Sequence, residues 1–186
     1  MIIRDQALTL INEHVNNKNI VKHMVALEAV MQALARKLNG DEVLWGMAGL
    51  LHDGDYCDEV SHDKQGIQIT QWARDKGYEI PDEVAHAMAA HNWHNTGVAP
   101  ESLMDWSIFC ADSLTGLIVA SALVQPDKKL SSVGVASVLK KFKNKAFAKN
   151  CRREIIMECE KIGLSLEEFV KIALTSMQSI SSQIGL

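Results

Sequence analysis

Apolar residues recur at helical spacing along almost the whole chain. Ile20, Met24, Leu27, Met31 and Leu34 step by four and three residues, which puts them on one face of a helix. The alternation of apolar and polar residues that is typical of strands is scarce, and the sequence holds only three prolines. This pattern predicts an all-α protein, a compact multi-helix bundle with helices over residues 4–16, 19–38, 42–53, 63–76, 82–93, 102–124, 131–142, 151–162 and 166–184.

The helix ends carry ordinary stop and start signals. Asn39-Gly40 is expected to end the second helix, and Asp41 to cap the third. There is no internal repeat, low-complexity segment or obvious linker. We therefore predict that residues 1–186 form a single domain, with a core over about 20–125 and a helical extension over about 126–186.

Composition and charge narrow the class of protein. Of the 186 residues 47% are hydrophobic and 23% are charged, which are ordinary globular values, and the net charge of −4 argues against a nucleic-acid-binding tail. The longest uncharged stretch, 113–126, is too short to span a bilayer, and the amino terminus lacks a signal-peptide pattern. The four cysteines show no CxxC spacing, which indicates reduced thiols. We expect a cytoplasmic protein with no membrane or stable nucleic-acid partner; the oligomeric state is not readable.

The chemistry that stands out is the pair His52-Asp53, which ends the apolar stretch Val43 to Leu51. Two ionisable groups at the end of a buried helix are costly unless they find a partner, and a divalent metal suits both imidazole and carboxylate. His23 points toward the core side of its helix. Asp112 shares an apolar helical stripe and has no basic residue nearby in sequence, so its carboxylate also requires a metal or a distant partner.

The order His23, His52-Asp53 and Asp112, each on a separate predicted helix, resembles the HD-domain superfamily of metal-dependent phosphohydrolases, whose pattern is H…HD…D. The resemblance covers roughly residues 20–125, and small HDIG-type bacterial proteins look closest. Here the motif continues with Gly54-Asp55, which departs from HDIG in its last two letters. The resemblance implies an HD fold that binds one or two divalent ions (Mn, Fe, Co, Ni, Mg or Zn). It also implies hydrolysis of a phosphoric ester, in a small phosphorylated metabolite or nucleotide, by a metal-activated hydroxide.

Many HD proteins hold a second metal with an H-x-x-x-G motif and a later histidine, and His62 and His91 fit these two places. The implied metal ligands are thus His23, His52, Asp53, His62, His91 and Asp112. The implied catalytic residues are Asp53, which would bridge two ions, His62, and Asp55 as a candidate proton donor. The alternative for Asp55 is a solvated acidic turn. His86 and His94 are expected to be supporting or surface residues. His86 and His91 are five residues apart, so on one helix their side chains point in different directions and should not share a metal.

A basic segment, residues 140–153, has seven basic residues in fourteen and no acid. Such a patch favours phosphate through charge and through the fork of arginine. We therefore predict that Lys143, Lys145 and Arg152 bind the substrate, the alternative being a solvated connection between helices. Phe142 and Phe147 either stack on a base or anchor the segment to the core.

Two other functions stay open. A few HD-fold enzymes are di-iron oxygenases with an H, HD, H, H, D ligand set, which the same six residues could supply. Other HD domains are non-catalytic nucleotide sensors with a degraded site, although all four core ligands are present here. Within the hydrolases, Tyr56 stands where guanosine-tetraphosphate hydrolases and some deoxynucleotidases have a glutamate, and no Gly-Tyr-Pro follows His94 as in cyclic-di-GMP phosphodiesterases. Those subclasses are therefore less favoured.

Overall fold

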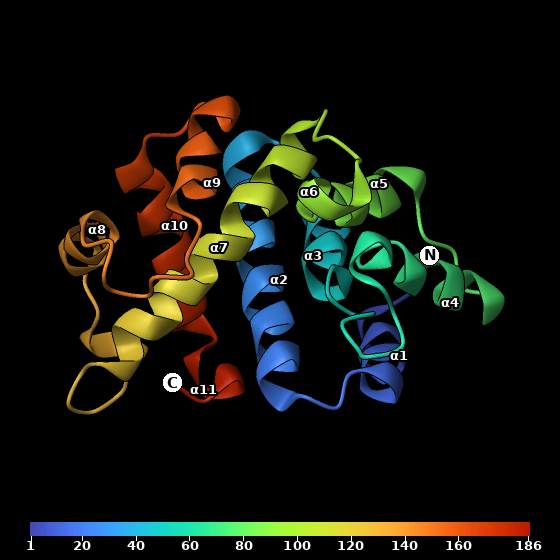
Figure 1. Cartoon of the computed structure of the whole chain (residues 1–186), viewed down its shortest axis with the longest axis horizontal. Helices are drawn as coiled ribbons and strands as arrows, with labels where there is room; N and C mark the ends of the chain where they lie inside the picture. The colour runs from blue at the N-terminus through green and yellow to red at the C-terminus, as the bar shows by residue number, and fades with distance from the viewer.

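The computed structural model describes residues 1–186 and contains helices but no strands, which confirms the all-α prediction. Figure 1 labels the eleven α-helices, and three short 3-10 helices (η1–η3) lie between them. In chain order the elements are α1 (Arg4–His14), α2 (Lys18–Leu38), α3 (Glu42–Leu51), η1 (His62–Lys64), α4 (Gln68–Asp75), α5 (Asp82–His91), α6 (Trp93–Thr96), α7 (Leu103–Leu123), η2 (Leu130–Ser132), α8 (Val135–Lys143), α9 (Arg153–Met157), η3 (Glu158–Ile162), α10 (Leu166–Ser179) and α11 (Ser181–Ile184).

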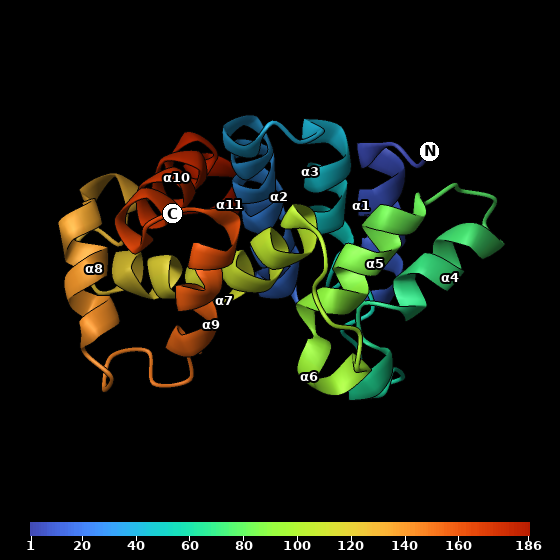
Figure 2. The same ribbon diagram turned by 90° about the horizontal axis from the view of Figure 1, so that it is seen from above.

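The helices are arranged around α2, α3 and α7. In Figures 1 and 2, α1, α4, α5 and α6 gather on one side of this centre, and α8, α9 and α10 gather on the other. Helix α7 joins the two sides, because it packs against α2, against α5, and against α8 and α9. One hydrophobic core of 46 buried residues runs from Ile2 to Ile184, so the extension after residue 125 shares the core of the preceding helices.

Gly49 allows α2 and α3 to pack closely together. A Cβ atom on Gly49 would lie 2.8 Å from the carbonyl oxygen of Leu27 on α2, which is closer than real Cβ contacts. Glycine therefore lets the two backbones approach at this point. His52 follows α3 by one residue, and His23 lies one turn before Leu27 on α2. The close packing thus brings the two imidazoles together.

The predicted helices are present, but several are shorter than predicted or are broken into two elements. Residues 63–76 form η1 and a shorter α4, because Gly66 between them has a left-handed φ of +87°. Helix α5 ends at His91, and the following residues turn into α6. Over residues 151–162 only a short α9 forms before the chain tightens into η3, and the last predicted helix breaks between α10 and α11. The helical pattern of the sequence did not predict the turn at Gly66.

Helix α7 has the length and mean hydropathy, 1.5 over its most apolar window, of a membrane-crossing helix. The same window is 61% buried inside the protein. Its apolar character is that of a central core helix, which must present hydrophobic surface to neighbours on several sides.

Candidate metal centre

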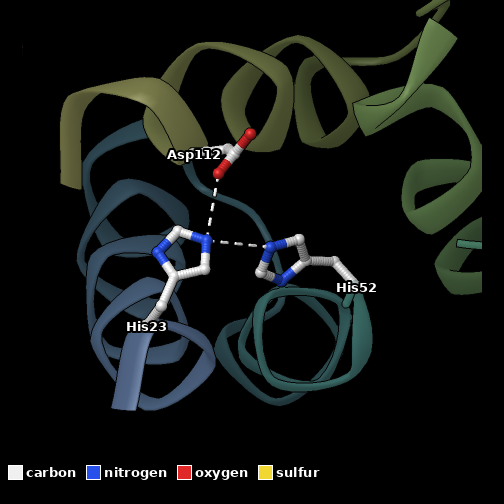
Figure 3. A group of neighbouring side chains, drawn as sticks. All are labelled: His23, His52 and Asp112. Carbon is white, nitrogen blue, oxygen red and sulfur yellow. Dashed lines mark hydrogen bonds and ion pairs between the residues drawn. The ribbon is translucent and has the colours of Figure 1, made fainter. Parts of the chain in front are cut away.

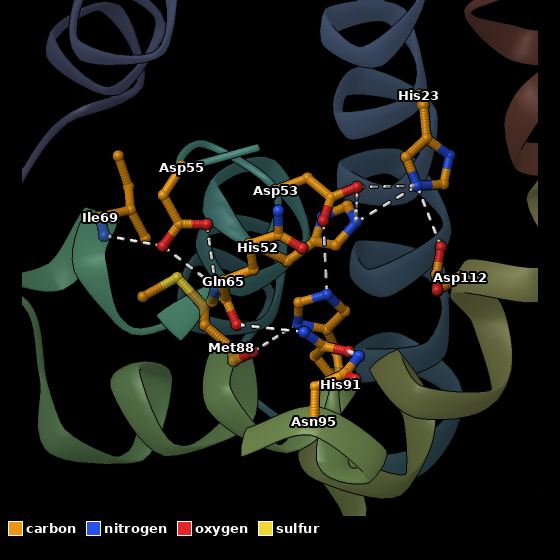
Figure 4. Close-up of polar contacts among 12 residues, drawn as sticks. His23, His52, Asp53, Asp55, Gln65, Ile69, Met88, His91, Asn95 and Asp112 are labelled. Carbon is orange, nitrogen blue, oxygen red and sulfur yellow. Dashed lines mark hydrogen bonds and ion pairs between the residues drawn. The ribbon is translucent and has the colours of Figure 1, made fainter. Parts of the chain in front are cut away.

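Side chains from four places in the chain converge on one point (Figure 4): His23 from α2, His52 and Asp53 from the end of α3, His91 from the end of α5, and Asp112 from α7. The potential ligand atoms of His23, His52 and Asp112 lie within 4.8 Å of one another, and so do those of His52, Asp53 and His91. The two groups share His52.

The contacts within the first group are short. Figure 3 shows Nε2 of His23 facing Nε2 of His52 at 3.2 Å and Oδ1 of Asp112 at 3.0 Å. The carboxyl group of Asp112 therefore turns toward His23, as a shared ligand set requires. In the second group Asp53 joins the histidines: its Oδ2 lies 3.4 Å from Nε2 of His52, and its Oδ1 lies 3.4 Å from Nε2 of His91.

Hydrogen bonds on the far side of each ring fix the tautomers. Nδ1 of His52 lies 2.8 Å from the carbonyl oxygen of Gly49, and Nδ1 of His91 contacts that of Met88. A carbonyl oxygen can only accept, so each Nδ1 carries the proton and donates it. Each Nε2 then directs a lone pair at the centre. Both carbonyls come from three residues earlier in the same helix, so this orientation is built into the local chain.

His23 is oriented by a different device. The hydroxyl of Thr115 donates to the carbonyl oxygen of Asp112 at 2.7 Å, which leaves its lone pairs to accept from Nδ1–H of His23 at 3.1 Å. The neutral ring of His23 therefore also presents a bare Nε2. Such partners on the outer nitrogen are usual for metal-binding histidines.

The electrostatics of the cluster favour a cation. Burial alone raises the pKa of both carboxyls, but the imidazoles outweigh it: His52 and His91 hold the pKa of Asp53 well below its ordinary value, and His23 lowers that of Asp112. Burial likewise lowers the pKa of His23 and His91, but their carboxylate partners raise it to above the ordinary value. Two ionised carboxylates and three converging lone pairs form a donor set that suits a divalent first-row metal.

Asp55 is part of the scaffold under this centre. It is 0% exposed, so the solvated acidic turn is wrong for this residue. Both of its carboxylate oxygens accept a hydrogen bond from the amide of Gly66, and Oδ2 also accepts one from the amide of Ile69. Burial raises the pKa of Asp55 despite these bonds. With its oxygens occupied and enclosed, Asp55 fixes the segment after α3 to the start of α4, a role that leaves no free oxygen for proton donation.

The same contact explains the unusual backbone of Gly66. With φ at +87°, a Cβ atom here would collide with the carbonyl oxygen of Met88, which is the hydrogen-bond acceptor of His91. The glycine of the H-x-x-x-G motif therefore supports His91 through its missing side chain.

His62 does not join the cluster in this structure. It is exposed on η1, and its Nδ1 lies 3.2 Å from Oε1 of Gln65, while neither group of potential ligands includes it. The prediction of His62 as a ligand rests on the spacing of its motif, and His62 lies on η1, before the turn at Gly66. The structure therefore brings together five of the six residues that were predicted as ligands.

The remaining histidines are placed as supporting or surface residues. Nδ1 of His86 lies 3.0 Å from Oδ2 of Asp105, a buried carboxylate that also caps the start of α7. His94 stacks on Trp93 in α6, after the helix has broken at Asn92. His91 and His94 consequently do not share a helix face.

A cleft of about 770 Å³ opens onto the centre and is lined by His23, Asp112, Ser113, Gly116 and residues of the connection between α8 and α9. Arg152, which was predicted to bind the substrate, lines this cleft, and its Nη2 lies 3.8 Å from Oδ2 of Asp112. Lys143 and Lys145 are exposed and lie outside the lining, so the structure does not bring them to the cleft. Lys149, which sequence reasoning missed, lines it instead. Phe142 and Phe147 pack against the core, in line with the anchoring alternative.

Comparisons with known proteins agree with this geometry. The family model described as "HD domain" matches residues 20–117, which is just over half of the chain. Among curated proteins, the chain is 28% identical over 142 residues to ribonuclease Y of a Nitratiruptor species, covering 74% of the chain and 26% of that protein. Ribonuclease Y of Desulforudis audaxviator is 33% identical over 99 residues, and that of Desulfotalea psychrophila is 31% identical over 101 residues.

Each of the latter two matches covers 53% of this chain and 18% of the relative. The chain thus spans about a quarter or less of the length of the curated relatives it matches. No solved structure matches it. The H…HD…D residues His23, His52, Asp53 and Asp112 all fall inside the matched range and lie together in space. The chain therefore belongs to the HD domain family.

Proposed function

We propose that this protein is a metal-dependent phosphohydrolase that releases phosphate from, or cleaves a phosphodiester in, a small phosphorylated metabolite or nucleotide. The observation that carries the proposal is the pair of imidazoles in Figure 3, whose Nε2 atoms lie 3.2 Å apart. When both rings are neutral, each carries its proton on Nδ1, so the two Nε2 lone pairs face each other. This arrangement is unfavourable unless a proton or a metal cation lies at the point where they meet.

The residues divide into two overlapping ligand sets. His23, His52, Asp53 and Asp112 would hold one ion, and Asp53 with His91 would contribute to a second one beside it. A bound divalent ion lowers the pKa of a ligand water and neutralises phosphate oxygens. The protein itself orients the donors through the carbonyls of Gly49 and Met88 and the hydroxyl of Thr115, so that little rearrangement is needed when the ion binds.

The cleft supports a phosphorylated ligand. Lys149 and Arg152 add positive charge to its wall, beside the carboxylate of Asp112. Arginine and lysine bind phosphate oxygens through charge-assisted hydrogen bonds. Another cavity, of about 580 Å³ between α2 and α10, reaches none of the ligand residues. The phosphorus atom of a substrate in the 770 Å³ cleft would meet the metal centre at the end formed by His23 and Asp112.

The test is a hydrolysis assay on the purified protein with Mn²⁺, Co²⁺, Ni²⁺, Mg²⁺ or Fe²⁺ added, in which phosphate release reports phosphomonoester hydrolysis and chromatography of the products reports phosphodiester cleavage. The substrates are phosphomonoesters, phosphodiesters, nucleotides and, because the curated relatives are ribonucleases, a short RNA. The control is Asp53→Ala, prepared in parallel. Turnover that depends on the metal and is absent from the control supports the proposal, and equal hydrolysis by both proteins contradicts it.

The di-iron oxygenase alternative is tested in the same preparation. Its six-ligand set needs His62, whose ring lies outside both groups of potential ligands. Metal analysis of protein purified without air, followed by measurement of oxygen uptake, separates the two functions. Bound iron with oxygen consumption would favour the oxygenase over the hydrolase.

A further inference from the structure

The connection between α8 and α9, residues 144–152, is organised by one side chain. The guanidinium of Arg153 donates to six backbone carbonyls, all of which lie between residues 141 and 151. Its Nε donates to Phe142 at 2.7 Å, Nη1 to Cys151 at 3.2 Å, and Nη2 to Asn144 at 3.0 Å. The other three acceptors are the carbonyls of Lys141, Phe147 and Ala148. The chain is wrapped around this cation, which also neutralises the carbonyl end of α8.

Two further features hold the same connection in one shape. Ala148 has a φ of +44°, a left-handed conformation that is unfavourable for a residue with a side chain. Its carbonyl is one of the acceptors of Arg153, so the strained residue lies where the guanidinium can hold it. Cys151 also contacts the carbonyl of Ser113 on α7 through its sulfur at 3.6 Å. Strained backbone that is held by its surroundings is frequent at functional sites.

The wrapped connection faces the metal centre. Lys149, Asn150, Cys151 and Arg152 line the 770 Å³ cleft together with His23 and Asp112 from the family motif. The family model ends at residue 117, so this part of the cleft wall lies outside the matched range. Arg153 itself does not line the cleft, because its guanidinium points into the carbonyls of the connection.

We propose that residues 144–152 form a preorganised anion-binding loop, and that Arg153 is the positioning residue that holds it. In this proposal Lys149 and Arg152 bind the anionic oxygens of a small, polar phosphate ester, while Arg153 acts only through the backbone. No Phe, Tyr or Trp side chain lines the cleft, which favours a polar ligand over one that must stack. The inference rests on the proposed phosphohydrolase function and names which part of the extension recognises the substrate.

The experiment compares Arg153→Lys with Lys140→Ala in the metal-loaded full chain. Arg153→Lys keeps the charge but replaces the planar fork with a single ammonium, which cannot reach six carbonyls. We expect KM to rise about tenfold or more with kcat within about threefold of wild type and with unchanged metal content. Lys140→Ala removes a charge from the same basic segment, on α8 and outside the cleft, and is expected to keep the wild-type KM. A wild-type KM for Arg153→Lys, or a fall in kcat alone, overturns the proposal.

A second measurement uses the unaltered protein and needs no turnover. Inorganic phosphate, at ionic strength matched with sodium chloride, should slow tryptic cleavage after Lys149 and Arg152 at least about threefold, while cleavage after the exposed Lys76 stays the same. Equal cleavage at all sites with and without phosphate overturns the loop proposal, whatever the activity. Protection without hydrolysis of any ester would instead contradict the proposed function and leave the loop as a binding element.

Discussion

The metal centre and the loop 144–152 hold their side chains by different means. In the metal centre, His52 and His91 each donate Nδ1–H to a carbonyl three residues earlier in the same helix. In the loop, one guanidinium from the following helix binds six carbonyls and thereby sets the backbone path that presents Lys149 and Arg152. The orientation of the two histidines needs only local helical geometry, whereas the positions of Lys149 and Arg152 depend on the backbone path of the whole loop. A change in the metal centre should therefore act on metal and turnover, and a change in the loop should act on substrate binding.

The largest effect is expected from Asp53→Ala. This carboxylate lies 3.4 Å from Nε2 of His52 and 3.4 Å from Nε2 of His91. In the proposed function it would bridge two ions. Its loss leaves the lone pairs without a bridging anion, so we expect bound metal to fall below one ion per chain and turnover to drop on the order of 10³-fold or more. Elemental analysis and phosphate release measure the two quantities. Asp63→Asn, an exposed acid on η1, is the matched control and should keep both. Wild-type turnover in Asp53→Ala would place the chemistry elsewhere.

The pH dependence of metal binding is expected to be the next largest effect. The pKa values of His23 and His91 are raised, because their carboxylate partners outweigh burial. In the metal-free protein their contribution to stability is therefore complete below the ordinary pKa of 6.5 and is lost as the pH rises through the raised values. The pKa values of Asp53 and Asp112 are lowered, so their contribution is present above 3.8 and is lost as the pH falls through the lowered values.

A bound metal ion should instead increase the stability of the folded protein as the pH rises, because the ion binds only Nε2 atoms that carry no proton. Each displaced proton should change the apparent metal affinity by up to about tenfold per unit of pH. We therefore expect the rise in melting temperature on adding Mn²⁺ to be small near about pH 5.5 and to grow toward about pH 8. Thermal unfolding of metal-free and metal-loaded protein across this range is the measurement. A rise that stays constant or shrinks with pH would mean that the ion does not compete with these protons.

A smaller effect is expected from Thr115→Val, which keeps the shape of the side chain but removes the acceptor of Nδ1–H of His23. Loss of such an outer partner typically lowers metal affinity about 10- to 100-fold. The metal concentration at half-maximal activity should rise accordingly, with KM for the substrate nearly unchanged. Thr175→Val, at an exposed position of α10, controls for the loss of a hydroxyl. If Thr115→Val instead raised KM alone, the distinction between the two regions would fail.

The sequence indicated well which side chains gather at the candidate metal centre, because their signal is chemical and local. Buried His52-Asp53, and Asp112 on an apolar stripe, are costly without a partner, and the structure brings them together with His23 and His91. Thr115 could be found only from contacts between helices, since it is 92 residues from His23. The enclosed hydrogen bonds of Asp55 depend on the turn at Gly66, whose left-handed backbone no helical periodicity reveals.

For the loop 144–152 the sequence predicted the positive charge but not which basic side chains line the cleft. Counting basic residues selected Lys143, Lys145 and Arg152, but the wrap around Arg153 leaves the first two outside the cleft lining and brings in Lys149.

The comparison of Lys149→Ala with Lys145→Ala tests this directly, because each removes one positive charge from the same segment. We expect KM to rise about three- to tenfold in Lys149→Ala and less than about twofold in Lys145→Ala, since both lysines are exposed but only Lys149 lines the cleft. The measurement is KM at two salt concentrations. Equal effects that disappear together at high salt would mean that the segment attracts the substrate only through its overall charge, and that the backbone path adds nothing.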